Sequence, residues 1–143
     1  MKKNVFRLLI LIFIITVISI YFYTKPHRHE QFKEKWNIEM PPGEEVYCKE
    51  HTDFFYGNRD SFVVYTANDT INYKLTNKRN AETEDKVEEI AKRLEVPDNE
   101  IPKFSELYWW NKKTYKYGSS LIILYFPSES KYYFIEEYLN SDR

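Results

Sequence analysis

The chain begins with a long apolar segment. Residues 5–23 are hydrophobic apart from Arg7, Thr16 and Ser19. As a helix with a rise of about 1.5 Å per residue, this segment covers roughly 28 Å, close to the ~30 Å hydrocarbon core of a bilayer. The aromatic residues at 21–23 are typical of a membrane interface. The pattern predicts an N-terminal transmembrane helix that contacts the lipid bilayer.

A cleaved signal peptide is the alternative interpretation of this segment. Signal peptidase requires a shorter apolar region that ends in small residues. Residues 21–26 are Tyr-Phe-Tyr-Thr-Lys-Pro instead, and no cysteine follows closely to carry a lipoprotein anchor. We therefore expect the helix to stay uncleaved as a signal anchor.

The basic residues around this segment bear on its orientation. Lys2, Lys3 and Arg7 lie at its start, and a similar number of basic residues lies between Lys25 and Lys35. Because positive charge favours the cytoplasmic side, the two flanks compete almost evenly. The short N-terminal tail carries no domain to translocate. We expect a single-pass protein of the cell membrane, with a cytoplasmic N-terminus and an extracytoplasmic C-terminal domain.

The pattern divides the chain into three parts. Residues 1–23 are expected to form the cytoplasmic start and the transmembrane signal anchor. Residues 24–44 are polar and contain three prolines and a glycine, which predicts a juxtamembrane stalk with a short helix over residues 30–38. Residues 45–143 are expected to form one extracytoplasmic domain with a single modest core.

Segments rich in β-branched and aromatic residues recur within residues 45–143 and predict the strands of one antiparallel sheet. The stronger candidates are residues 46–49, 61–67, 121–126 and 131–139. Two weaker candidates are residues 115–117 and residues 71–75, of which the second could equally begin a helix. Residues 96–111, with two prolines and both Trp109 and Trp110, are expected to form a loop.

One segment has a clear helical period. In residues 82–94, Val87, Ile90, Ala91 and Leu94 recur at helical spacing and form one apolar stripe. Acidic residues crowd the first turns and basic residues the last, as the helix dipole favours. The domain is therefore predicted to be α+β, an antiparallel sheet of about five strands with one amphipathic helix packed on it.

The composition bears on which partners the domain can bind and on what stabilises its fold. The net charge is −1, and since the charged residues before Thr24 are all basic, the predicted domain is mildly acidic. Nucleic-acid binding requires a clustered basic face, so no nucleic acid is expected. Cys48 is the single cysteine and cannot close an intramolecular disulfide. Aromatic residues make up 18% of the chain and predict a tightly packed core.

The densest group of polar side chains lies between residues 51 and 60. It comprises His51, Asp53, Asn58, Arg59 and Asp60. An imidazole beside carboxylates is the minimum for general-base chemistry, so one hypothesis is an envelope hydrolase that uses His51 with Asp53 or Asp60. The alternative is a turn whose Asp and Asn side chains bond their own backbone. The chain has no glycine-rich phosphate loop or nucleophile elbow, and we expect no catalytic residue, no metal and no cofactor.

The same segment carries aromatic residues that follow no strand or helix period. Phe54 and Tyr56, together with Arg59 nearby, are of the types that dominate protein interfaces. Trp109 and Trp110 precede two lysines and could add a second aromatic edge. The candidate binding residues are His51, Phe54, Tyr56, Arg59, Asp60, Trp109 and Trp110.

The order of features over residues 45–139 loosely resembles a group of small exported proteins of Gram-positive bacteria, membrane-anchored or lipoprotein-like and uncharacterised. Their corresponding loop is roughly His-Gly-Gly-Phe-x-Gly-Asp-Gly. Here His51, Phe54, Gly57 and Asp60 fit that loop with small shifts in spacing. The resemblance implies location at the cell envelope and a similar fold.

These observations favour a membrane protein that displays a non-catalytic binding domain. Its partner would be a protein or a component of the cell envelope. One form of this hypothesis is an accessory or immunity-like role for a neighbouring gene product. The envelope hydrolase is the alternative hypothesis.

Overall fold

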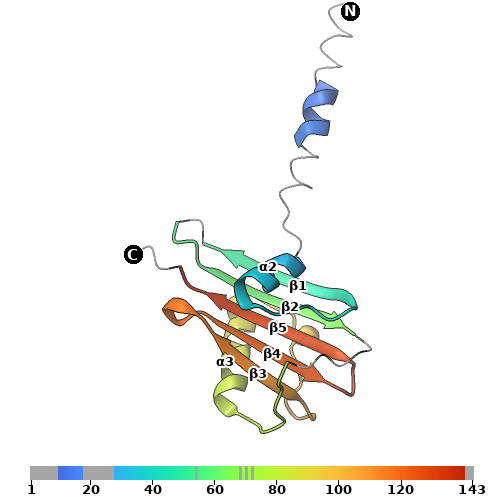
Figure 1. Cartoon of the computed structure of the whole chain (residues 1–143), viewed down its shortest axis with the longest axis vertical. Helices are drawn as coiled ribbons and strands as arrows, with labels where there is room; N and C mark the ends of the chain where they lie inside the picture. The colour runs from blue at the N-terminus through green and yellow to red at the C-terminus, as the bar shows by residue number, and fades with distance from the viewer. Residues whose placement is uncertain are drawn as a thin grey trace, which may run out of the picture. The chain divides into compact units, whose positions relative to one another are not determined.

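The structure is a computed structural model and describes residues 10–17, 28–53, 55–67, 69, 71 and 73–140 (Figure 1). It divides into two compact units, Met1–Glu39 and Met40–Arg143, each described here by itself. Phe54, one of the predicted binding residues, lies outside the described residues.

The first unit contains two described helices. Residues 10–17 are helical, and α2 (Arg28–Trp36) begins and ends two residues earlier than the predicted stalk helix. None of the helices in the described part of the chain is both long and apolar enough to cross a membrane. The predicted span of residues 5–23 lies outside the described residues except for 10–17. After α2, Asn37 adopts a positive φ of 50°.

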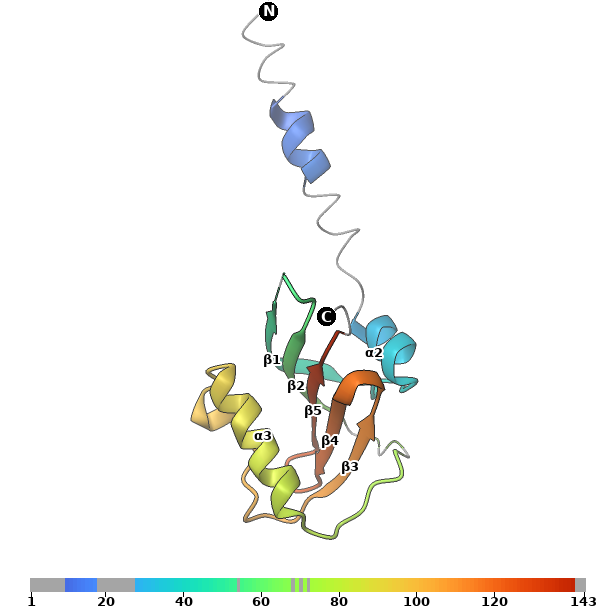
Figure 2. The ribbon, with the colours of Figure 1, turned by 90° about the vertical axis from the view of Figure 1, so that its left-hand side faces the viewer.

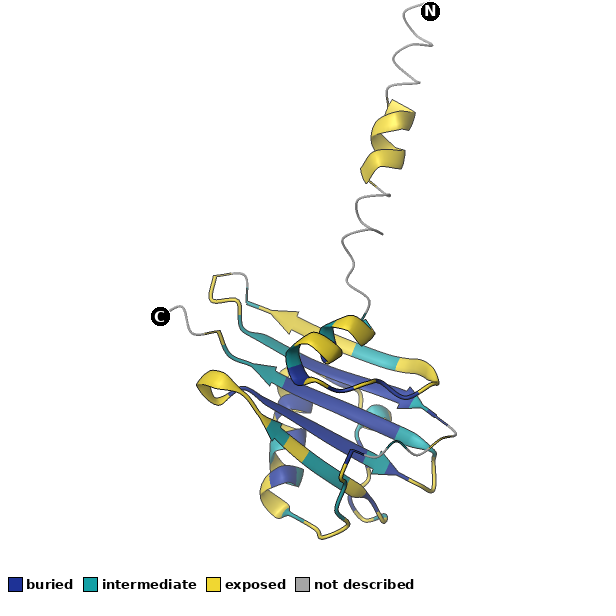
Figure 3. Cartoon of the chain, in the orientation of Figure 1, coloured by how far each residue is buried: buried dark blue, intermediate teal, exposed yellow. Residues whose placement is uncertain are grey.

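The second unit is built on one five-stranded antiparallel sheet, which confirms the predicted α+β class (Figure 1). The order across the sheet is β1-β2-β5-β4-β3, with β5 in the centre. The strands are β1 (Glu44–Thr52), β2 (Arg59–Thr66), β3 (Trp109–Thr114), β4 (Ser120–Phe126) and β5 (Lys131–Tyr138). Figure 3 shows that the inner strands β2, β5 and β4 are mostly buried, whereas β1 is largely exposed.

Two of the weaker strand predictions are wrong. Residues 71–75 form no strand where they are described, and only Thr76 makes an isolated bridge, to Trp110. Residues 115–117 belong to the turn between β3 and β4, where Tyr117 and Gly118 both have positive φ. The edge strand β3 instead uses the tryptophan segment that had been assigned to a loop. Trp109 pairs with Tyr125 of β4 and Trp110 with Leu124, and such cross-strand pairs stabilise a hairpin.

The amphipathic helix α3 (Ala81–Arg93) forms where the sequence predicts it. The side chain of Asn80 caps it by accepting a hydrogen bond from the Thr83 amide at 2.9 Å. Figure 2 shows the helix lying against one face of the sheet. Its stripe of Val87, Ile90 and Ala91 is buried there, so helix and sheet form the two layers of the domain.

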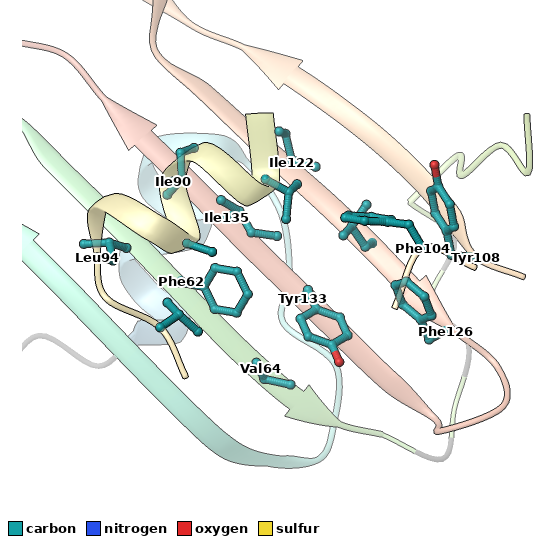
Figure 4. Packing of buried hydrophobic residues seen from close by; sticks show 14 residues of the cluster. Phe62, Val64, Ile90, Leu94, Phe104, Tyr108, Ile122, Phe126, Tyr133 and Ile135 are labelled. Carbon is teal, nitrogen blue, oxygen red and sulfur yellow. The ribbon is translucent and has the colours of Figure 1, made fainter. Parts of the chain in front are cut away.

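The core lies between α3 and the side chains that alternate toward it from the strands (Figure 4). Phe62 and Val64 of β2, Ile122 and Leu124 of β4, and Ile135 of β5 are fully buried there. Phe62 packs edge to face on Tyr133, which extends the aromatic part of this core.

The opposite face of the inner strands is also apolar and buried. The side chains there include Val63, Leu121, Ile123, Tyr132 and Phe134. Within the second unit, Tyr73 packs edge to face on both Tyr132 and Phe134.

Candidate functional site

Two turns lie at the same end of the sheet and expose aromatic side chains. The β1–β2 turn carries Phe55 and Tyr56, and the β3–β4 turn carries Tyr115 and Tyr117 (Figures 1 and 2). Phe55 is 96% exposed, Tyr117 is 63% exposed, and the other two rings are also classed as exposed. We call these four residues the aromatic end. Exposed apolar surface of this kind at one end of a sheet is a candidate for a binding site.

The β1–β2 turn is held by its own backbone and by Asp53. The Asp53 amide donates to Asn58 O, and the Gly57 amide donates to Asp53 O, each at 2.8 Å. The Asp53 carboxylate accepts from the amides of Phe55 at 2.9 Å and Tyr56 at 3.4 Å. This is the local side-chain bonding that the polar composition predicts. These hydrogen bonds fix the backbone of the turn that carries the exposed Phe55 and Tyr56 rings.

The residues that follow β5 join the two turns. The Asn140 amide donates to the Asn58 side chain at 3.0 Å. One residue earlier, the Leu139 amide donates to Ser119 Oγ at 2.9 Å, and that hydroxyl donates to Leu139 O at 3.1 Å. Because one short segment bonds to both turns, the aromatic end is a preorganised surface, which lowers the entropy lost on binding.

A polar pocket lies beside the β1–β2 turn. It has a volume of about 250 Å³ and is lined by His51, Asp53, Asn58, Arg59, Asp60, Arg93, Glu137 and Leu139. The sheet register explains why these side chains meet, since His51 is opposite Asp60, and Asp60 is opposite Glu137. The structure therefore brings His51, Asp53, Asn58 and Asp60 together around one pocket, whereas the Arg59 side chain also pairs on the other face of the sheet. Within the described part of the chain, no three His, Cys, Asp or Glu side chains are arranged to hold a metal ion.

The carboxylates of the polar pocket are engaged by cations of α3. Arg93 contacts Asp60 at 2.7 Å and Glu137 at 2.9 Å, and Lys86 contacts Glu137 at 3.1 Å. Burial alone would raise the pKa of the Glu137 carboxyl, but the hydrogen bonds from Lys86 and Arg93 outweigh burial and lower that pKa. These pairs link α3 to the sheet.

Arg59 and Glu136 form a separate cluster on the other face of the sheet. Glu136 is 1% exposed and lies 3.4 Å from Arg59 Nε, while the Ser61 hydroxyl donates to it at 3.3 Å. Arg59 also contacts Glu50 at 3.2 Å. Adjacent residues in a strand point to opposite faces, so Glu136 and Glu137 do not form a carboxylate pair. Arg59 is therefore held within the sheet.

The two tryptophans lie away from the aromatic end. Trp109 is 38% exposed and pairs with Tyr125 near the end of β4, which is the opposite end of the sheet from the turns. Trp110 points to the other face, packs against the core and donates its indole N–H to Lys78 O at 2.6 Å. The structure does not bring them together with the segment from His51 to Asp60.

Sequence reasoning missed Tyr115 and Tyr117, because these residues were assigned to a strand. Gly118 was the available signal, since a glycine directly after Lys116 and Tyr117 favours a turn with positive φ. Lys116 lies over the Tyr115 ring, 6.0 Å from its centroid, and adds a cation to this aromatic surface.

No protein-family model matches the chain, and no match was found among curated proteins or among solved structures. The case for a function therefore rests on the aromatic end and on the polar pocket.

Proposed function

We propose that this chain is a single-span membrane protein that displays a non-catalytic binding domain outside the membrane, and that the aromatic end contacts a protein partner. The apolar segment over residues 5–23 supports the membrane anchor. The resemblance of residues 45–139 to exported envelope proteins of Gram-positive bacteria supports the same location. The observation that carries the binding role is the 96% exposure of Phe55 in a turn that hydrogen bonds hold in place.

A protein partner suits the chemistry of this surface. Tyr and Phe are enriched at the centres of protein interfaces, where burying one such ring is worth roughly 2–3 kcal/mol. Tyr56, Tyr115 and Tyr117 each add a hydroxyl that can hydrogen-bond, and Lys116 adds a positive charge. Because the backbone of both turns is already bonded to the segment after β5, little ordering is required when a partner binds.

The proposal is tested by photocrosslinking in native membranes. A benzophenone amino acid is placed at position 55, and in a matched control at position 107, because Leu107 is an exposed apolar residue at the opposite end of the sheet, 64% exposed. We expect a discrete protein adduct from position 55 that weakens when Tyr56→Ala and Tyr117→Ala are added. Identical adducts from positions 55 and 107 would contradict the proposal.

An envelope hydrolase remains the second candidate, because His51, Asp53 and Asp60 do share one pocket. Two contacts weigh against it, since Arg93 pairs with Asp60 and Asp53 caps the turn. A hydrolase that uses this pocket would release fragments from purified cell envelope and lose that activity in His51→Ala. The binding function predicts no release with either form and unchanged crosslinking in His51→Ala.

A further inference from the structure

A row of aromatic side chains crosses four strands on the sheet face opposite α3. Tyr65 of β2 is paired with Tyr132 of β5, Tyr132 with Tyr125 of β4, and Tyr125 with Trp109 of β3. Tyr125 and Tyr132 are stacked, with ring centroids 4.4 Å apart and an interplanar angle of 25°. The row lies at the end of the sheet away from the aromatic end, about 20 Å from it along β5 at ~3.4 Å per residue.

The outer part of this row is hollowed into a pocket of about 430 Å³, within the ~300–1,000 Å³ range of ligand sites. We call it the aromatic pocket. It is lined by Ile71, Tyr73, Leu75, Trp109, Tyr125, Pro127 and Tyr132.

The walls of the aromatic pocket are fixed. Tyr132 is fully buried, and Tyr73 packs against it edge to face at 5.7 Å. The Tyr132 hydroxyl accepts a hydrogen bond from the Ile71 amide at 3.0 Å, which ties Ile71 to β5. Trp109, at 38% exposure, leaves part of its ring open to solvent. The pocket therefore has a rigid aromatic floor and an accessible aromatic rim.

The absence of charged side chains from the pocket lining restricts the class of ligand that it can bind. None of the seven lining residues is charged or carries an amide side chain. A charged ligand group would lose its hydration there without an ionic partner, and a sugar would leave several hydroxyls without hydrogen bonds. The lining favours an uncharged, largely apolar ligand that presents flat rings and accepts a few hydrogen bonds from tyrosine hydroxyls.

Proline-containing segments in the polyproline II conformation meet these requirements. They dock into grooves lined by aromatic residues, and they lose little entropy because their conformation is already extended. Their backbone carbonyls accept hydrogen bonds, and their pyrrolidine rings pack on tyrosine and tryptophan. We propose that the aromatic pocket binds an uncharged, proline-containing extended segment of a partner protein. This second site is independent of the aromatic end.

The test uses the full chain in detergent micelles, labelled with 5-fluorotryptophan. The three tryptophans, Trp36, Trp109 and Trp110, give three fluorine signals that are assigned by single Trp→Phe variants. The probe is a decaproline peptide with blocked ends, titrated to about 1 mM. We expect the Trp109 signal to shift in a saturable manner while the Trp110 signal, on the other face of the sheet, stays in place.

Two variants locate the binding. Tyr125→Ala removes one ring of the stack, and Leu75→Lys places a charge in the lining at a half-buried position. Each is expected to weaken decaproline binding at least about tenfold. An unmoved Trp110 signal shows that each variant keeps its fold. Phe55→Ala, which disrupts the aromatic end, leaves decaproline binding unchanged, so failure of one site is distinguished from failure of the other.

Three outcomes overturn the proposal. The first is no shift of the Trp109 signal with decaproline. The second is decaproline binding that Leu75→Lys leaves unchanged. The third is a Trp109 shift caused by a chitin oligosaccharide but not by decaproline, which would assign the aromatic pocket to a sugar.

Discussion

At the scale of single residues, the three glycines differ in what a side chain would meet. Gly118 and Gly57 have positive φ. An added Cβ would lie 3.8 Å from the Leu139 side chain at Gly118 and 2.8 Å from the side-chain nitrogen Nδ2 of Asn140 at Gly57. At Gly43 the added Cβ would clash with the Thr66 carbonyl oxygen, a backbone atom of β2. A flexible side chain can move aside, whereas a paired backbone carbonyl cannot.

These distances predict an order of destabilisation. Gly118→Ala and Gly57→Ala should each cost about 1–2 kcal/mol, chiefly through strain at positive φ. Gly43→Ala should cost more, because β2 must shift at Thr66. Thermal unfolding of the full chain in detergent ranks the three variants. A Gly43→Ala variant as stable as the other two would contradict the close approach of these segments.

Phe55 and Phe62 provide a second comparison between residues of the same type. Phe55 is 96% exposed and Phe62 is fully buried. Phe62→Ala should cost about 3–5 kcal/mol of unfolding free energy. Phe55→Ala should change it by less than about 0.5 kcal/mol. Urea unfolding measures both, and a large loss in Phe55→Ala would mean that the ring serves the fold rather than a partner.

At the scale of elements, the contact of α3 with the sheet depends on charge as well as on its apolar stripe. Lys86 and Arg93 reach Glu137 from α3, and Arg93 also reaches Asp60. Side-chain hydrogen bonds from these cations keep the pKa of Glu137 below its ordinary value of 4.5. The folded state therefore binds fewer protons at this carboxyl than the unfolded state does in mild acid.

The ion pairs of Glu137 make the stability of the fold depend on pH. Stabilisation by Glu137 is complete above its unfolded pKa of about 4.5 and is lost as pH falls through the lowered folded value. The urea midpoint of the wild type should therefore fall between about pH 5 and pH 3. Glu137→Gln should be less stable at pH 7 and should show a weaker pH dependence over that window. Equal slopes for both proteins would show that the Glu137 pairs contribute nothing.

The elements also show how far local sequence predicts this fold. The inner strands β2, β4 and β5 and the helix α3 were predicted because burial imposes a strong apolar pattern on them. The edge strand β3 was missed, since its two adjacent tryptophans followed by Asn and two lysines show no strand period, and its pairing with β4 is decided by tertiary context.

The candidate sites differ in how much of each could be predicted from the sequence. Only part of the polar pocket could be identified from the sequence, because His51, Asp53, Asn58 and Asp60 are near neighbours, whereas Arg93, Glu137 and Leu139 come from distant segments. The aromatic end and the aromatic pocket were not predicted, because each combines residues from distant segments. Tyr115 and Phe55 lie at the same end of the molecule only because of the order of strands in the sheet. Tyr73 and Trp109 line the same pocket although 35 residues separate them in the sequence. Such groupings depend on the order of strands, which no local pattern specifies.

At the scale of the whole molecule, the proposed anchor predicts opposite accessibility for the two ends of the chain. In a Cys48→Ser background, a cysteine replaces either Asn4 or Ser105, an exposed residue of the second unit. A membrane-impermeant maleimide should label the Ser105→Cys variant in intact cells. It should label the Asn4→Cys variant only after lysis. The reverse pattern would mean that the second unit faces the cytoplasm.

The anchor also predicts how the protein behaves during fractionation. The mature protein should keep its N-terminal residues and stay in the membrane pellet after an alkaline wash, because roughly 20 apolar residues are long enough to span the bilayer. Mass spectrometry of the purified protein checks the N-terminus. A mature chain that starts near Thr24 would show that the segment is a cleaved signal peptide.

If the aromatic end binds a protein partner, its exposed rings should carry most of the binding energy. The most direct test is the affinity of the crosslinked partner for the wild type, Phe55→Ala, Tyr117→Ala and the control Leu107→Ala. Phe55→Ala should weaken binding by about thirtyfold or more, which corresponds to ~2 kcal/mol, and Tyr117→Ala should weaken it to a smaller extent. Leu107→Ala should change the affinity less than about twofold. Equal affinities for Phe55→Ala and the wild type would contradict the account.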